Sequence, residues 1–380
     1  MGSLGEKYVV AGVDMTDLYP VPFPDNLPTV ELQTVSVAKL LSHDEQESQR
    51  IFAFCKDPGF FLLDLTDHPE GVRLLQDATD CCRLAKKLFT SLTIDQKREY
   101  KTRSAGGGAG IFDMGYFTRD ILPSGDVKYN ETMNFPVQDM FGYSSSPDFA
   151  LPGWLEADEV ELIKRTMRSG NTMGNIVLSG LEQSLQIANN KLQAAHRLED
   201  PSGDFLRLLR YPGYDPAANA DHLRFPAHKD AISLGLLFTW LGGLQLPAVD
   251  AERLAHEEIS EASWRWARPV PGTAIVNMGD ALELLTNGAL TSGLHRVVRA
   301  PREQAPHDRY SVLLSLRPAN TWPMTPLESP VIRPLTAAAK EAKAAAPVLT
   351  CAEWGAAKLK ALGGRFTERE QRKERLNLKD

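Results

Sequence analysis

Cysteine is scarce in this chain of 380 residues, which has four, at positions 55, 81, 82 and 351. Their spacing matches none of the paired patterns that bind structural zinc. Cys81 and Cys82 are adjacent, in a stretch that we expect to be helical. A disulfide framework is therefore not predicted. Reduced thiols are typical of cytosolic proteins, so we expect the protein to be cytoplasmic.

The sequence also lacks a basic excess and a long apolar run. Lys and Arg number 42 against 49 Asp and Glu, giving a formal net charge of −7, and no basic stripe with interleaved aromatic residues is present. This argues against a nucleic-acid partner. No apolar stretch approaches the length of a membrane span, and the first six residues match neither a signal peptide nor a myristoylation pattern. We expect no membrane partner.

The composition that is present is that of a globular protein. Hydrophobic residues make up 43% of the chain and charged residues 24%, which is enough to bury a sizeable core. We find no internal repeat and expect one unit over residues 1–380. Within it, residues 27–145 should combine helices with strands, residues 204–318 should be rich in strands, and residues 335–380 should form helices and a charged tail.

Several element boundaries can be predicted from residue types. Ser36 and Asp44 can each cap a helix, the second of which should reach about residue 56. Pro69 suits the first turn of a helix that should end near residue 92. Residues 156–198 have a helical pattern, with glycines as bends or close-packing points. Strands then dominate from residue 205 to residue 316, which favours a double-sheet jelly roll.

The run Ala105–Gly110 is rich in glycine, so a phosphate-binding loop is one interpretation. Such loops join a strand to the N-terminus of a helix. No strand pattern precedes this run and no helical pattern follows it. A mobile loop is therefore favoured.

The stretch from residue 225 to residue 311 contains three potential metal ligands and a potential anion-binding pair. His228 and Asp230 are two apart, so in a strand both would point to the same face. A second histidine from a later strand, His295, would complete a set of two imidazoles and one carboxylate. This set suits non-haem Fe(II) and leaves coordination positions open. Arg309 and Ser311 are again two apart, and an arginine fork with a nearby hydroxyl suits a carboxylate.

The order of these residues, with the glycines and prolines between them, resembles the iron- and 2-oxoglutarate-dependent dioxygenases of the isopenicillin N synthase-like superfamily. The resemblance covers about residues 27–362 and is strongest from Arg207 to Pro318. It implies an α+β fold in which N-terminal and C-terminal helices flank a double-stranded β-helix (jelly-roll) core. It also implies Fe(II) held by His228, Asp230 and His295. The other expected cofactors are 2-oxoglutarate as cosubstrate, O2, and ascorbate as an accessory reductant.

Further site residues follow from the same resemblance. Arg309 and Ser311 would hold the far carboxylate of 2-oxoglutarate, and Tyr211 would support it. Many relatives carry Asn two residues before this tyrosine, where this chain has Leu209. The expected substrate-contacting residues are Phe225, Tyr116, Asn134, Gly235, Leu313 and Ser315. Each has a structural alternative: core packing for the aromatic residues, a close backbone approach at Gly235, and barrel filling for Leu313 and Ser315.

The resemblance implies an oxidoreductase that oxidises a small organic metabolite by hydroxylation, desaturation, or ring formation or rearrangement, in specialised-metabolite biosynthesis. One alternative is an iron oxidase like isopenicillin N synthase, which uses no 2-oxoglutarate. Phe205 stands where that enzyme has a serine that holds its peptide, and the C-terminal tail lacks its glutamine. Another alternative is a non-enzymatic binding barrel. We expect a monomer or a weak homodimer with a small-molecule substrate.

Overall fold

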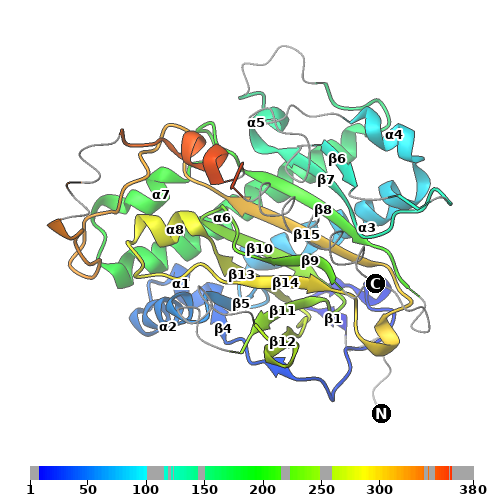
Figure 1. Ribbon diagram of the computed structural model, residues 1–380, viewed down its shortest axis with the longest axis horizontal. Helices are drawn as coiled ribbons and strands as arrows, with labels where there is room; N and C mark the ends of the chain where they lie inside the picture. The colour runs from blue at the N-terminus through cyan, green and yellow to red at the C-terminus, as the bar shows by residue number, and fades with distance from the viewer. Residues whose placement is uncertain are drawn as a thin grey trace, which may run out of the picture.

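The computed structural model describes residues 8–100, 115–118, 121–122, 124–143, 150–214, 223–248, 259–337, 341, 347–358 and 360–361. Two β-sheets lie at its centre, and helices cover the outer side of the larger sheet (Figure 1). Within the described residues, no helix is both long and apolar enough to cross a membrane.

The larger sheet has eight strands, and all neighbours in it run antiparallel except β4 and β5. Strands from the N-terminal portion form both of its edges, so residues distant in sequence share one sheet. In order across the sheet the strands are β4 (Thr34–Ser36), β5 (Phe60–Asp64), β13 (Thr273–Met278), β10 (Leu234–Thr239), β15 (Arg309–Leu316), β8 (Phe205–Tyr211), β7 (Glu131–Pro136) and β6 (Gly115–Thr118).

The smaller sheet has five strands, and it carries the two histidines of the predicted metal site. In order these are β3 (Thr29–Val30), β12 (Trp264–Ala267), β11 (Leu244–Pro247), β14 (His295–Val298) and β9 (Leu223–His228). A separate antiparallel pair is formed by β1 (Val9–Val10) and β2 (Val13–Asp14).

Capping explains where several helices begin. The Ser36 hydroxyl accepts a hydrogen bond from Lys39 N at 3.1 Å, and the Asp44 carboxylate accepts one from Glu47 N at 2.8 Å, as predicted. The labelled α-helices are α1 (Val37–Leu41), α2 (Glu45–Lys56), α3 (Pro69–Ser91), α4 (Ile94–Glu99), α5 (Val137–Met140), α6 (Ala157–Leu185), α7 (Lys191–Ala195) and α8 (Asp280–Leu285). Residues 351–358 are also helical.

The predicted helix over residues 156–198 is interrupted. The long helix α6 ends at Leu185, and Gln186 adopts a left-handed conformation with φ of 53°. Asn189 and Asn190 also have positive φ, which asparagine tolerates better than most residues. Gly170 and Gly174 do not bend α6; they allow it to pack closely on Leu314 and Leu316 of β15.

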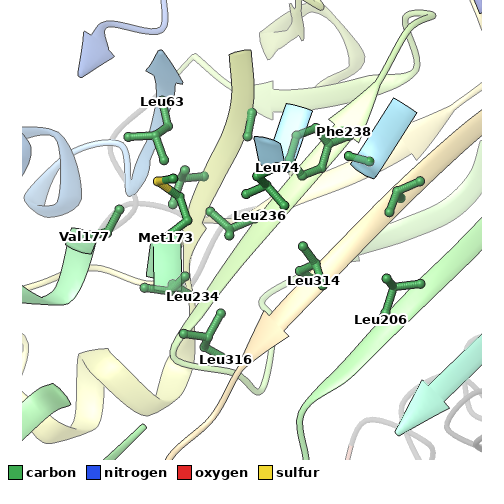
Figure 2. Packing of buried hydrophobic residues seen from close by; sticks show 14 of the residues in the cluster. Leu63, Leu74, Met173, Val177, Leu206, Leu234, Leu236, Phe238, Leu314 and Leu316 are labelled. Atoms are coloured by element: carbon green, nitrogen blue, oxygen red, sulfur yellow. The ribbon is translucent and has the colours of Figure 1, made fainter. Parts of the chain in front are cut away.

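The main hydrophobic core lies between the larger sheet and the helices α3 and α6. Because side chains alternate along a strand, the even-numbered residues of the central strands face these helices and the odd-numbered residues face the smaller sheet. Figure 2 shows the helix-facing set against Leu74 of α3 and Met173 and Val177 of α6. This set includes Leu206, Leu234, Leu236, Phe238, Leu314 and Leu316. The odd-numbered face is thereby left to line a cavity between the sheets.

Candidate active site

The predicted metal ligands lie close together at one end of the smaller sheet, where β9 ends and β14 begins. His228 of β9 and His295 of β14 are register partners, with ring centroids 4.2 Å apart. Asp230 Oδ1 lies 3.4 Å from His228 Nε2, and Asp230 Oδ2 lies 3.8 Å from His295 Nε2. The three ligand atoms are all within 4.8 Å of one another. β9 ends at His228, so the irregular segment after the strand brings Asp230 to the site, rather than strand alternation.

Backbone carbonyl groups orient both imidazole rings. His228 Nδ1 lies 2.9 Å from Pro226 O, and His295 Nδ1 lies 3.1 Å from Gly293 O. A carbonyl oxygen can only accept, so these contacts place the proton on Nδ1 and leave the Nε2 lone pair facing Asp230. This is the tautomer that a metal-binding histidine needs.

Asn277 of β13 orients the carboxylate. Its amide Nδ2 donates a hydrogen bond to Asp230 Oδ2 at 2.8 Å. The side chain of Asn277 lies beside Gly235, where a Cβ would come within 2.5 Å of Asn277 Oδ1. The space beside Gly235 is therefore filled by side chains, first the Asn277 amide, and not by another backbone segment.

The electrostatic environment favours the metal-binding protonation states of Asp230 and His295. Burial alone raises the pKa of Asp230, but His295, His228 and the Asn277 amide outweigh it and lower the pKa below its usual value. Burial, followed by the proximity of His228, lowers the pKa of His295 to about 4. At neutral pH these two groups are therefore a carboxylate and a neutral imidazole, the protonation states that bind a metal.

The predicted cosubstrate anchor lies deeper in the same cavity. Arg309 is 3% exposed and is the register partner of Tyr211, and its guanidinium carbon is 5.1 Å from the Tyr211 ring centroid. Gly243 makes room for it, because a Cβ there would lie 2.8 Å from Arg309 Nε. The buried Ser311 Oγ has no hydrogen-bond partner within the described chain.

This arrangement fits a bound organic carboxylate. Arg309 makes no ion pair with any carboxylate that the structure describes; its one hydrogen bond is from Nε to Leu241 O at 3.4 Å. A buried cation and a buried hydroxyl without partners both cost stability. A carboxylate between them would satisfy both groups.

The other predicted site residues separate into two groups. Phe225 and Leu313 line the cavity. Tyr116, Asn134, Gly235 and Ser315 do not belong to the lining, and three of them hold neighbouring groups instead. The Tyr116 hydroxyl donates to Glu131 Oε2 at 2.9 Å, Asn134 Oδ1 accepts from Arg207 Nε at 2.5 Å, and Ser315 Oγ accepts from Phe205 N at 3.1 Å. The glycine-rich run at 105–110 lies outside the described residues.

Several lining residues were not predicted as site residues from the sequence. They include Arg207, Arg317, Phe117 and Asn277. Arg207, Leu209 and Tyr211 alternate along β8, and each is paired with an inward-facing residue of β15. The spacing of Arg207 and Tyr211 was the signal that could have identified Arg207 as a lining residue, because residues four apart on a strand share a face. Which face would be inward depends on pairing with β15, a strand distant in sequence.

Comparisons with known proteins agree with this chemistry. The family model of the 2OG-Fe(II) oxygenase superfamily matches residues 203–318. A 2-oxoglutarate-dependent dioxygenase of Aspergillus fumigatus is 54% identical over 375 residues, 97% of this chain and 95% of the relative. Another, from Dothideomycetidae sp., is 27% identical over 291 residues, 76% of this chain and 82% of the relative.

Solved structures show the same fold. A full-length Neurospora crassa protein, in complex with alpha-KG and 5-formyluracil, superimposes with a TM-score of 0.67 at 18% identity, covering 89% of this chain and 100% of that one. The predicted α+β fold with a double-stranded β-helix core is confirmed. With two histidines and an aspartate close enough to hold one metal ion, the chain belongs to the 2OG-Fe(II) oxygenase superfamily and is a 2-oxoglutarate-dependent dioxygenase, an oxidoreductase.

Proposed function

We propose that this dioxygenase oxidises a small organic metabolite of fungal specialised metabolism, by hydroxylation, desaturation, or ring formation or rearrangement. The observation that carries the proposal is the single cavity in which the metal-ligand cluster and the carboxylate anchor lie beside apolar side chains such as Phe225, Leu237 and Leu313. Such a cavity suits a small, largely apolar molecule. The fungal sources of the relatives support the biological setting.

In this proposal each residue has one task. His228, Asp230 and His295 hold Fe(II), and Asn277 keeps the Asp230 carboxylate in position. Arg309 holds the distal carboxylate of 2-oxoglutarate through its planar fork, with Ser311 donating a further hydrogen bond and Tyr211 packing against the guanidinium. When bound, the Fe(II) supplies the O2 chemistry that couples oxidative decarboxylation of 2-oxoglutarate to oxidation of the organic substrate.

The N-terminal strands support the proposal that the chain acts as one catalytic unit. Residues 27–145 contribute β4, β5, β6 and β7 to the same sheet as the strands of residues 204–318. Phe60 of β5 lines the cavity and meets the His295 ring edge-on at 5.5 Å. A monomer or weak homodimer, and an accessory role for ascorbate, complete the proposal.

The first test concerns the metal and the cosubstrate separately. His228→Ala, Asp230→Ala and His295→Ala should each lose iron after anaerobic reconstitution and lose succinate formation, because the site has no spare ligand. Arg309→Lys keeps the charge but loses the fork, so 2-oxoglutarate should bind about tenfold more weakly. Its iron content should equal that of the wild type.

The measurements are iron content and titration of the iron charge-transfer band with 2-oxoglutarate under anaerobic conditions. Wild-type iron content and activity in any of the three alanine variants would remove that residue from the metal site. If Arg309→Lys leaves the 2-oxoglutarate titration unchanged and weakens the organic substrate instead, the anchor holds the substrate. An oxidase that uses no 2-oxoglutarate would then be the better interpretation.

A further inference from the structure

Two arginines converge near one aromatic ring at a different part of the cavity from Arg309. Arg207 is on the inner face of β8, opposite Leu313 of β15, and Arg317 follows the end of β15. Both line the cavity. Their guanidinium carbons lie 4.5 Å and 5.7 Å from the centroid of the Phe205 ring. Two cations are therefore held close together against a single ring.

Neither arginine has an ion-pair partner among the residues that the structure describes. Arg207 Nε donates to the neutral Asn134 Oδ1 at 2.5 Å, and no described acceptor meets its terminal nitrogens. Arg317 Nε is buried and has no hydrogen-bond partner among the described residues. Burial lowers the pKa of both, that of Arg207 to about 10. Keeping such cations desolvated and unpaired costs stability.

The charges around the cavity do not balance without a further anion. Among the described lining residues, Asp230 is the one carboxylate, against the cations Arg207, Lys229, Arg309 and Arg317. Lys229 Nζ pairs with Glu283 Oε2 at 3.2 Å. Asp230 serves the metal, and Arg309 serves the cosubstrate. Arg207 and Arg317 are therefore the two lining cations without an assigned counter-charge.

The buried Asp204 offsets the burial of Arg317 only in part, because the pKa of that arginine is still lowered. Asp204 accepts a hydrogen bond from the backbone N–H of Arg317 at 2.5 Å, and no ion pair forms with the Arg317 side chain within the described residues. Burial raises the pKa of Asp204 to about 7.

Arg210 on the same strand is a useful contrast. It lies on the opposite face of β8, where Arg210 Nη1 meets Glu131 Oε1 and Arg210 Nε meets Asp308 Oδ2, each at 2.7 Å. Where an arginine of β8 has a structural task, the chain supplies carboxylates for it. Arg207, three residues earlier, has none and faces the cavity.

We propose that Arg207 and Arg317 bind a carboxylate of the organic substrate, so that the enzyme acts on an organic acid whose apolar body lies against Phe225, Leu237 and Leu313. This inference rests on the proposed function. It also requires a second anion site distinct from that of 2-oxoglutarate. Arg207 and Tyr211 are separated by four residues of β8, roughly 13 Å of strand, which separates the two sites.

The test uses the full-length protein loaded with Fe(II) and 2-oxoglutarate in the absence of O2. The probes are the straight-chain alkanoates from acetate to octanoate, each with its neutral amide as a matched control, and binding is measured by calorimetry. We expect at least one alkanoate to bind saturably and its amide to bind at least tenfold more weakly. Arg207→Met and Arg317→Met should each weaken alkanoate binding at least tenfold, because the guanidinium fork is the recognition group.

Three controls distinguish a binding role from a structural one. Arg210→Met should leave alkanoate binding unchanged. It should lower the thermal unfolding temperature, because two carboxylates lose their arginine partner. Arg207→Met should keep or raise that temperature, because it removes an unpaired buried charge. Titration of the iron charge-transfer band with 2-oxoglutarate should be the same in Arg207→Met and wild type.

The outcomes separate this inference from the proposed function. Absence of the charge-transfer band on adding Fe(II) and 2-oxoglutarate to the wild type would contradict the proposed function. A normal band with no alkanoate binding, or with amides binding as well as acids, would overturn the substrate-carboxylate site. So would weaker 2-oxoglutarate binding in Arg207→Met, which would assign Arg207 to the cosubstrate, or a lower unfolding temperature in that variant with unchanged alkanoate binding.

Discussion

At the scale of single residues, the proposed metal site depends on a side chain that is not one of its proposed ligands. The Asn277 amide fixes one oxygen of Asp230, and the absence of a side chain at Gly235 leaves the space that Asn277 occupies. Groups that orient metal ligands commonly contribute roughly 10-fold to 100-fold to affinity. Gly235 thus acts on the metal through two intermediates, Asn277 and then Asp230.

Gly235→Ala should therefore weaken Fe(II) binding by roughly 10-fold to 100-fold, because the new Cβ would displace the Asn277 amide. Anaerobic Fe(II) titration of the purified variant measures this. Asn277→Ala should give a similar loss, and the double variant should lose little more, since both changes remove one contact. Gly153→Ala is the control, because a Cβ there meets nothing within 4 Å.

The opposite pattern would support the substrate-space interpretation of Gly235. In that case Gly235→Ala would bind Fe(II) as the wild type does and would weaken only the organic substrate. The titration of Asn277→Ala would then differ from that of Gly235→Ala, and the coupling between the two positions would be absent.

At the scale of elements, the inner face of the larger sheet is positioned by how closely α6 packs on its outer face. Gly170 and Gly174 are one turn apart on α6 and face Leu314 and Leu316 of β15. These leucines alternate with Leu313 and Ser315 on the opposite face of the strand. A change in the distance between α6 and β15 would therefore be transmitted to the cavity wall.

Gly174→Ala should lower the free energy of unfolding by up to about 2 kcal/mol. A Cβ at this position overlaps the buried Leu316 side chain, and overpacking costs about 1–3 kcal/mol, which the gain of about 1 kcal/mol in helix propensity only partly offsets. Gly355→Ala is the matched control. It lies in the helix at 351–358, where a Cβ meets nothing within 4 Å, so it should stabilise by about 1 kcal/mol. Urea unfolding of both variants measures the difference. A change in the free energy of unfolding with the same sign in both variants would contradict the packing argument.

The elements also show what the sequence could predict. Local signals identified the starts of α1 and α2, because a cap depends on residues three apart. Motif order predicted that His228 and His295 lie close together with Asp230, as the structure shows. The roles of Asn134 and Ser315 were not, because they depend on which strand pairs with which and in what register. A shift of one residue moves every side chain to the other face, and the partners of Asn134 and Ser315 lie 73 and 110 residues away.

At the scale of the whole molecule, one buried histidine joins the helical layer to the larger sheet. His196 is 1% exposed and follows α7. Its Nδ1 lies 2.6 Å from Leu192 O, and its Nε2 lies 2.6 Å from Ser233 Oγ, just before β10. The carbonyl can only accept, so Nδ1 carries the proton and Nε2 accepts from the serine hydroxyl. Both contacts are compatible with the neutral ring.

Protonation of His196 should make the folded state less stable in mild acid. Burial lowers its pKa from 6.5 to about 4, so between these values the unfolded chain binds a proton that the folded chain does not. Stability then rises with pH across this window, is complete above about 6.5, and is lost as pH falls towards 4. At pH 5 the loss from this one group should be about 2 kcal/mol relative to pH 7.5. Asp204, whose pKa burial raises to about 7, acts in the opposite direction, so the total slope does not isolate His196.

The comparison of wild type with His196→Gln isolates it, because glutamine keeps polar groups at this position and does not titrate. The free energy of unfolding should be measured by urea titration at pH 7.5, 6.5, 5.5 and 5 in the metal-free protein. The stability difference between wild type and variant should shrink by about 2 kcal/mol as pH falls from 7.5 to 5. A difference that stays constant across these pH values would mean that His196 takes up its proton in the folded protein as readily as in the unfolded chain. The junction between α7 and β10 would then tolerate a charged ring.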